Sequence, residues 1–184
     1  MLHQCGIQNI KDFDLNGKTQ NELNEELANK DIILVEGGNT FYLLHHVRKS
    51  GFDKILPGLL NDGKLYVGIS AGSYIACPTI EAATWKHAGR NKVGLKDLTA
   101  LNLVPFLISA HFEEKYRTII EQASMKTIYP IVALRDSQAI LVENGNYELV
   151  GKRDKNFFNG FNERRRRETN LIEKDGQNRI DKEN

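Results

Sequence analysis

The chain has 184 residues, enough for one α/β domain with a substantial core but too few for two such domains. Its 25 Lys and Arg residues nearly balance 24 Asp and Glu residues, so the net charge of +1 does not favour nucleic acid or an acidic surface as a partner. The longest apolar runs have the length of strands, far short of the ~20 residues that cross a bilayer, so no membrane-spanning segment is expected.

The N-terminus and the cysteines predict a cytoplasmic protein. The first residues lack the charged region, apolar core and small-residue cleavage site of a secretory signal. Cys5 and Cys77 are far apart and form no CxxC pair, which favours reduced thiols over a disulfide framework.

The first elements of the chain alternate between helix and strand. Leu23 and Leu27 are four residues apart, so residues 21–30 are predicted to form a short surface helix with both side chains on one face. Residues 31–35 contain the continuous apolar run Ile32–Val35, typical of a strand buried on both faces. A glycine turn then leads to a predicted helix over residues 40–50.

Alternation of helix and strand continues through most of the chain. We predict helices at residues 52–60 and 71–76, strands at residues 65–69, 103–108 and 128–134, and a hairpin over residues 139–150. This order predicts a single α/β domain over residues 1–151, with a mostly parallel sheet flanked by helices on both faces. Residues 152–184 are polar and lack apolar periodicity, so we expect them to form a disordered tail.

Ser70 is the strongest candidate for a catalytic nucleophile. Residues 68–72 form a G-x-S-x-G pattern between a predicted strand and a predicted helix, as in a nucleophile elbow. The glycines leave room for the strained turn, and the following helix directs its first N–H groups toward the reacting centre. The pattern alone is equally compatible with a plain glycine turn, and its place between strand and helix favours the nucleophile.

His111 is the best candidate for the base that a serine nucleophile needs. Of the five histidines it alone directly follows an apolar strand, so it reaches the sheet edge where Ser70 lies. The alternative is a structural histidine ahead of the helix that begins near Glu113.

Several carboxylates compete for the role of orienting the imidazole. Asp136 is preferred because it also follows a predicted buried strand. Asp97 has the chain position that the α/β-hydrolase order requires, but it lies in a polar loop. Glu113 and Glu114 have a simpler interpretation as residues at a helix N-terminus. The preferred triad is therefore Ser70, His111 and Asp136.

Backbone N–H groups at two glycine turns are candidates for an oxyanion hole. Gly38, in a paired-glycine turn, is expected to face Ala71 across the cleft, although a simple tight turn is the alternative. No G-x-G-x-x-G follows either early strand, so no dinucleotide is expected. A metal is not expected either, because His45 and His46 are adjacent and the cysteines lack ligand partners.

Taken together, these motifs resemble the peptidase E family. The similarity rests on G-G-N-T-F-Y-L-L at residues 37–44, G-I-S-A-G-S at residues 68–73, C-P-T-I at residues 77–80 and A-H-F at residues 110–112. Several motifs in the same order are more specific than one, and the match runs roughly from residue 31 to residue 150. The family has the class I glutamine amidotransferase-like fold, with serine where the amidotransferases have cysteine.

The resemblance implies an activity of the aspartyl dipeptidase type. Such an enzyme hydrolyses dipeptides or short peptides with an N-terminal aspartate and needs no cofactor. It implies Ser70 as nucleophile, His111 as base, and Gly38 and Ala71 as oxyanion donors. The glutamate of the family that follows the next strand falls at Asp136.

Further expectations concern substrate binding and the N-terminal part of the fold. Asn39 and Arg135 are the candidate substrate-binding residues, and Arg135 and Arg90 are the candidates for recognising an aspartate side chain. Members of the family usually carry a further strand and helix before the region that matches this chain. We therefore expect the domain to lack the first strand-helix unit.

Two classes of function remain compatible with the sequence. The first is a serine peptidase acting on small peptides. The second is a catalytically inactive or truncated amidotransferase-like domain that binds a ligand or a partner subunit. The sequence leaves a homodimer open. Residues 164–167 are four arginines next to glutamates, which is more typical of a solvated tail than of a nucleic-acid site.

Overall fold

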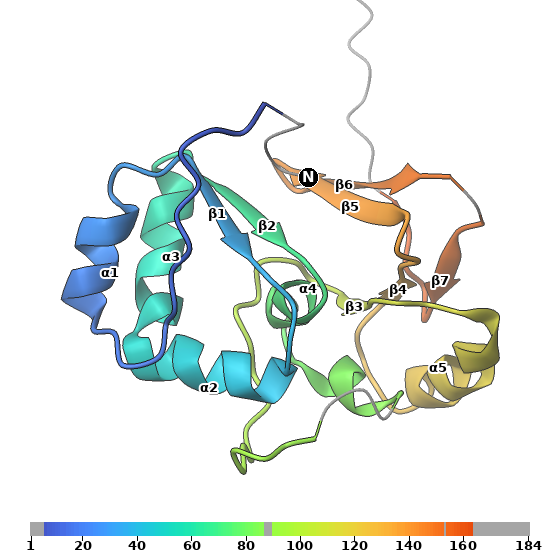
Figure 1. The fold of residues 1–184 in the computed structure, drawn as a ribbon. Helices are drawn as coiled ribbons and strands as arrows, with labels where there is room; N and C mark the ends of the chain where they lie inside the picture. The colour runs from blue at the N-terminus through green and yellow to red at the C-terminus, as the bar shows by residue number, and fades with distance from the viewer. Residues whose placement is uncertain (1–5, 87–89, 153, 164–184) are drawn as a thin grey trace, which may run out of the picture.

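The computed structural model describes residues 6–86, 90–152 and 154–163 (Figure 1). In chain order the elements are α1 (Gln20–Leu27), β1 (Ile32–Val35), α2 (Thr40–Ser50), α3 (Phe52–Asn61), β2 (Leu65–Gly68), α4 (Ala71–Ile75), the 3-10 turn η2 (Glu81–Thr84), β3 (Leu107–Ser109), the 3-10 turn η3 (Glu114–Tyr116), α5 (Arg117–Ser124), β4 (Ile131–Ala133), β5 (Gln138–Glu143), β6 (Asn146–Gly151) and β7 (Asn156–Phe158). The predicted α/β class is confirmed. The predicted elements are present with shifted ends, most of all the strand expected at residues 103–108, which is β3, and β7 was not predicted.

The N-terminal region, residues 6–86, is built on the parallel pair β1 and β2, with α1, α2 and α3 packed beside it (Figure 1). A capping box at Thr19 begins α1, and the Asn39 side chain caps α2. Gly51 ends α2 with φ +78°, a conformation that glycine adopts without strain, and so allows α3 to begin at once.

The strands of this region are less buried than their apolar sequences predict. Ile32, Leu65 and Ile69 are 40%, 51% and 49% exposed. Full burial of these strands is therefore not observed at these three positions, because no described element covers the side chains. Ile33 on the opposite face is buried in the core with the helices.

The C-terminal region, residues 90–163, contains the remaining strands. β3 pairs in parallel with β4, and β7 adds to the other edge of β4 in the antiparallel direction. β5 and β6 form the predicted antiparallel hairpin. The core of this region is a separate cluster of buried side chains that includes Phe106, Ile120 and Val132.

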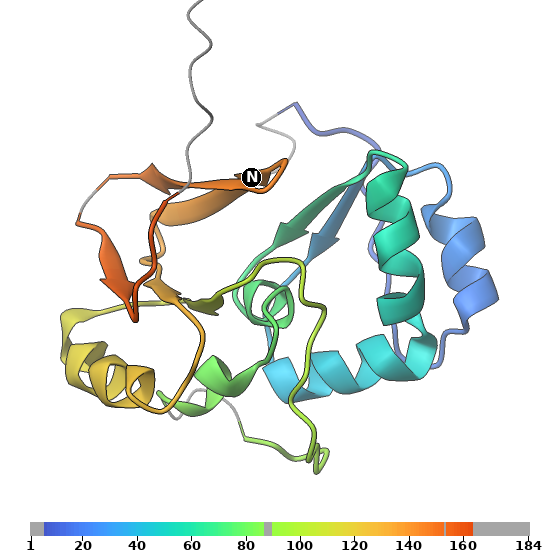
Figure 2. The same cartoon turned by 180° about the vertical axis from the view of Figure 1, so that it is seen from behind.

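The domain extends beyond the predicted boundary at residue 151. The pairing of β7 with β4 and the burial of Phe161, which is 4% exposed, show that residues 154–163 belong to the folded domain (Figure 2). A tail beginning at residue 152 is therefore wrong for this stretch, because the rings of Phe157 and Phe161 pack against each other at a tilt, their centroids 4.6 Å apart. Residues 164–184, with the four arginines, lie outside the described residues.

The short helix α4 lies between the two regions in both views (Figures 1 and 2). It packs on β2 and α2 on one side and on β3 on the other. The carboxyl ends of β2, β3 and β4 consequently approach one another around the start of α4, as expected for sites in α/β sheets. None of the described helices has both the length and the apolar character needed to span a membrane.

Candidate active site

Ser70 occupies a strained turn between β2 and α4. Its backbone has φ +52° and ψ −106°, a conformation that is rare for a residue with a side chain. A Cβ added to Gly72 would lie 2.1 Å from the carbonyl oxygen of Val35, and one added to Gly68 would lie 2.7 Å from the Gly72 backbone. Both glycines of the G-x-S-x-G pattern are thus required by close backbone approach.

His111 lies in a break in the ladder between β3 and β4. Leu134 N–H donates to Ser109 O, and Phe112 N–H donates back to Leu134 O, so the two residues between Ser109 and Phe112 leave the ladder. His111 itself has φ +56°. This turn directs its side chain to Ser70, where Nε2 is 2.8 Å from Oγ.

Asp136 completes a chain of hydrogen bonds through His111. It follows β4, and its Oδ1 lies 2.7 Å from His111 Nδ1. Because an ionised carboxylate only accepts hydrogen bonds, this contact places the proton of a neutral imidazole on Nδ1. Nε2 is then free to accept from the Ser70 hydroxyl. The side chains of His111 and Asp136 are 59% and 80% exposed, so the pair is open to solvent.

The competing carboxylates are engaged elsewhere. Asp97 binds the Arg48 guanidinium and accepts hydrogen bonds from Thr99, which hold the pKa of its carboxyl below the ordinary value. Glu113 pairs with the neighbouring Lys115. Among the predicted acids, the structure brings Asp136 to His111.

The two predicted oxyanion donors flank Ser70. A Cβ added to Gly37 would lie 3.2 Å from Ser70 Cβ, so the paired-glycine turn runs directly against the serine. Gly38 follows with φ +130°, and Ala71 is the first residue of α4. Within residues 6–86, 90–152 and 154–163, neither N–H group donates to a protein acceptor.

The proposed substrate-binding side chains differ in how free they are. Both ends of the Asn39 amide are used internally, because Oδ1 accepts from Tyr42 N–H and Nδ2 donates to Arg90 O. Asn39 therefore caps α2, and its role in binding substrate stays a prediction. The Arg135 guanidinium lies over the Phe112 ring, 4.9 Å from its centroid, and 3.5 Å from Glu114.

Arg90 lines a cavity of about 480 Å³ beside the N-terminus of α2. The other lining residues are Phe41, Thr84, Asn91, Leu95, Lys96 and Leu98. The Asn39 amide donates to the Arg90 carbonyl, so the cavity lies near the Gly38–Asn39 turn, although Ser70 and His111 do not line it. Arg90 and Lys96 give it a cationic lining.

One question is whether Cys77 could act as a nucleophile in place of Ser70. Cys77 is buried, and burial raises the pKa of its thiol to about 12, so it is no competitor to Ser70 as a nucleophile. Cys5 lies outside the described residues.

Lys86 was not predicted to be near the site, yet its ammonium binds the Ala110 carbonyl next to His111. No local motif marks it, because the contact spans 24 residues.

Comparison with known proteins points to one family. A model of Peptidase family S51 matches residues 1–150. An uncharacterized peptidase of Pasteurella multocida (strain Pm70) is 35% identical over 140 residues, which cover 73% of this chain and 67% of the relative. Peptidase E of Escherichia coli O1:K1 / APEC is 32% identical over 141 residues, covering 68% of this chain and 57% of that protein.

Solved structures give the same picture of the fold. A crystal structure of a Listeria monocytogenes EGD-e protein, described as a peptidase E, superposes with a TM-score of 0.71 at 27% identity, over 83% of this chain and 74% of that one. A peptidase from an acI-B1 Actinobacterium has a TM-score of 0.58 at 14% identity, over 79% of this chain and 60% of that one. The second likeness concerns the fold alone.

Proposed function

Since this chain belongs to peptidase family S51, a family of serine-type peptidases, we propose that Ser70, His111 and Asp136 are its catalytic triad. The observation that carries the proposal is the continuous chain of hydrogen bonds from Ser70 Oγ through both nitrogens of His111 to Asp136. Each residue comes from a different strand end, so the arrangement depends on the whole fold.

In the proposed mechanism, His111 Nε2 takes the hydroxyl proton as Ser70 Oγ attacks the carbonyl carbon of the scissile peptide bond. Gly38 and Ala71 N–H groups stabilise the oxyanion of the tetrahedral intermediate. When the intermediate collapses, His111 returns the proton to the leaving amine. Water then attacks the acyl-serine while His111 accepts its proton, and His111 returns that proton to Ser70 Oγ as the acid is released. Asp136 stabilises the imidazolium in both steps.

The proposed substrate is a dipeptide or short peptide with an N-terminal aspartate. Family resemblance suggests it, and the cavity with Arg90 and Lys96 offers two cations for an acidic side chain. Arg90 is the better of the two predicted arginines, because Arg135 is held by Glu114 and by the Phe112 ring. No cofactor enters this mechanism, and we propose a cytoplasmic enzyme without a nucleic-acid partner.

Hydrolysis of a small peptide panel tests the function. We expect the wild-type chain to cleave Asp-Leu faster than Asn-Leu, because only the first carries a side-chain carboxylate. Ser70→Ala is expected to remove hydrolysis of both while its circular dichroism spectrum and thermal midpoint remain those of the wild type. A folded wild-type chain that cleaves none of these peptides would favour the inactive, ligand-binding alternative.

A further inference from the structure

Lys86 is buried beside the turn that carries His111. Only 8% of its surface is exposed, and its ammonium donates to the carbonyl oxygens of Ala110 and of His111, the second at 3.4 Å. These two residues are the ones that leave the β3–β4 ladder, so their carbonyls lack strand partners among the described residues. The Tyr74 hydroxyl also donates to Ala110 O at 3.5 Å.

We propose that Lys86 is a positioning residue, which holds the His111 turn so that its imidazole can reach Ser70 and Asp136 at once. The inference rests on the proposed triad. A histidine at φ +56° is in an uncommon conformation that the surroundings must maintain. One ammonium that bonds both carbonyls of the turn opposes rotation of either peptide, whereas the exposed imidazole itself has few packing contacts to fix it.

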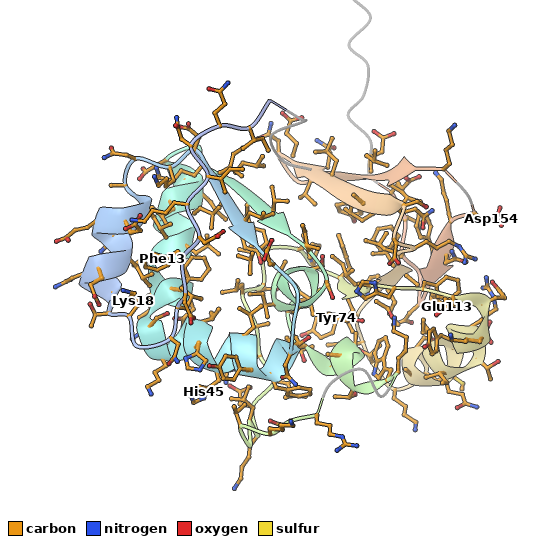
Figure 3. All side chains as sticks on the ribbon, viewed as in Figure 1. Phe13, Lys18, His45, Tyr74, Glu113 and Asp154 are labelled. Carbon is orange, nitrogen blue, oxygen red and sulfur yellow. The ribbon has the colours of Figure 1, made fainter. Side chains whose placement is uncertain are left out.

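Charged and aromatic groups from several elements surround the Lys86 ammonium. Asp136 follows β4, Glu113 precedes η3, and both carboxylates favour the ammonium. The Tyr116 ring lies 5.3 Å from Nζ, a cation–π contact from η3. Figure 3 shows Tyr74 at the centre of the molecule by α4, and Glu113 on the side of α5. Burial is the larger effect and lowers the pKa of Lys86 to about 8.

This titration makes the positioning role measurable. Above about pH 8 the neutral amine binds the two carbonyls more weakly, so catalysis is expected to decline. Stability changes in the opposite direction. Between about pH 8 and the ordinary value of 10.5, the folded chain binds fewer protons at Lys86 than the unfolded chain, so this residue's contribution to the free energy of unfolding rises with pH. A loss of activity in this window is therefore not caused by a loss of stability at Lys86, and the thermal midpoint measured at each pH shows whether the chain stays folded.

The test measures the rate at which a fluorophosphonate modifies Ser70 between pH 6 and pH 10. For the wild type we expect the rate to fall above about pH 8. Lys86→Met is expected to be labelled about 10- to 100-fold more slowly at pH 7, because the base is misplaced. Lys86→Arg is expected to restore most of the rate and to remove the alkaline fall, since arginine stays charged.

Lys64→Met is the matched control. Lys64 also donates to two backbone carbonyls, Ala28 O at 2.7 Å and Lys30 O at 2.8 Å, but at the opposite end of β2 from Ser70. The Lys64→Met variant is expected to have a lower thermal midpoint, while the pH dependence of Ser70 labelling stays that of the wild type. Wild-type labelling of Lys86→Met at every pH would overturn the proposal. If Lys86→Met does not fold, an unchanged alkaline fall in Lys86→Arg overturns it. A wild type that is not labelled at all would instead reject the proposed triad.

Discussion

The turns that carry Ser70 and His111 are held in different ways. Both residues have positive φ, +52° for Ser70 and +56° for His111. The serine turn is held locally, because Gly68 and Gly72 let α4 press against β1 and β2. The histidine turn is held from a distance, since Lys86 and Tyr74 bind its carbonyls from other elements. A strained turn can thus be specified by its own sequence or by its neighbours.

The difference also concerns exposure. The serine turn begins the buried helix α4 between the two regions of the molecule, whereas His111 and Asp136 project from the C-terminal region into solvent. We therefore expect changes at the glycines of the serine turn to act first on the fold, and changes at the histidine side to act first on the rate of reaction. The following predictions test this division, beginning with the largest effect.

Gly72→Ala is expected to destabilise the whole chain by about 3 kcal/mol or more, because the new Cβ would lie 2.1 Å from the Val35 carbonyl oxygen and backbone must move. Urea unfolding measures the change. Gly58→Ala is the control, since no atom lies within 4 Å of its added Cβ in the exposed part of α3. It is expected to stabilise by about 0.5–1 kcal/mol. Equal free energies of unfolding for the two variants would show that the contact with the Val35 carbonyl does not require glycine at position 72.

Asp136→Asn is expected to slow labelling of Ser70 by roughly 10- to 100-fold with little change in stability. The effect should be smaller than the ~10⁴-fold loss for a buried triad aspartate, because solvent screens a side chain that is 80% exposed. Asp97→Asn is the control, because Asp97 is an exposed carboxylate that binds Arg48 rather than the His111 turn. A rate for Asp136→Asn that matches the rate for Asp97→Asn would exclude Asp136 from the triad.

The same contrast explains what the sequence could predict. Ser70 was recognisable because its glycines and the flanking strand and helix are contiguous in the chain, and His111 and Asp136 because each follows an apolar strand. Lys86 could not be found this way. Its ammonium donates to backbone carbonyl oxygens 24 and 25 residues away, and a backbone acceptor leaves no residue pattern in the sequence.

Features that the sequence did not predict depend on contacts between residues far apart in the chain. Both ends of the Asn39 amide have protein partners, one of them 51 residues away. The stretch after residue 151 is polar in sequence, yet β7 pairs with the edge of β4 and Phe161 packs in the core. Apolar strands predicted full burial of β1 and β2, whereas Ile32 and Leu65 remain exposed. In each case the contacts of a residue depend on which other segment of the folded chain lies beside it.

The central claim, that Ser70 is activated by His111, is tested most directly by intact-mass analysis after treatment with a fluorophosphonate. Displacement of fluoride by Ser70 Oγ should give one adduct on the wild-type chain, mapped to Ser70 by peptide sequencing. For His111→Gln, with an unchanged thermal midpoint, labelling should be about 10²- to 10⁴-fold slower, because the base that accepts the hydroxyl proton is gone. An adduct on another residue, or equal labelling of the two chains, would contradict the account.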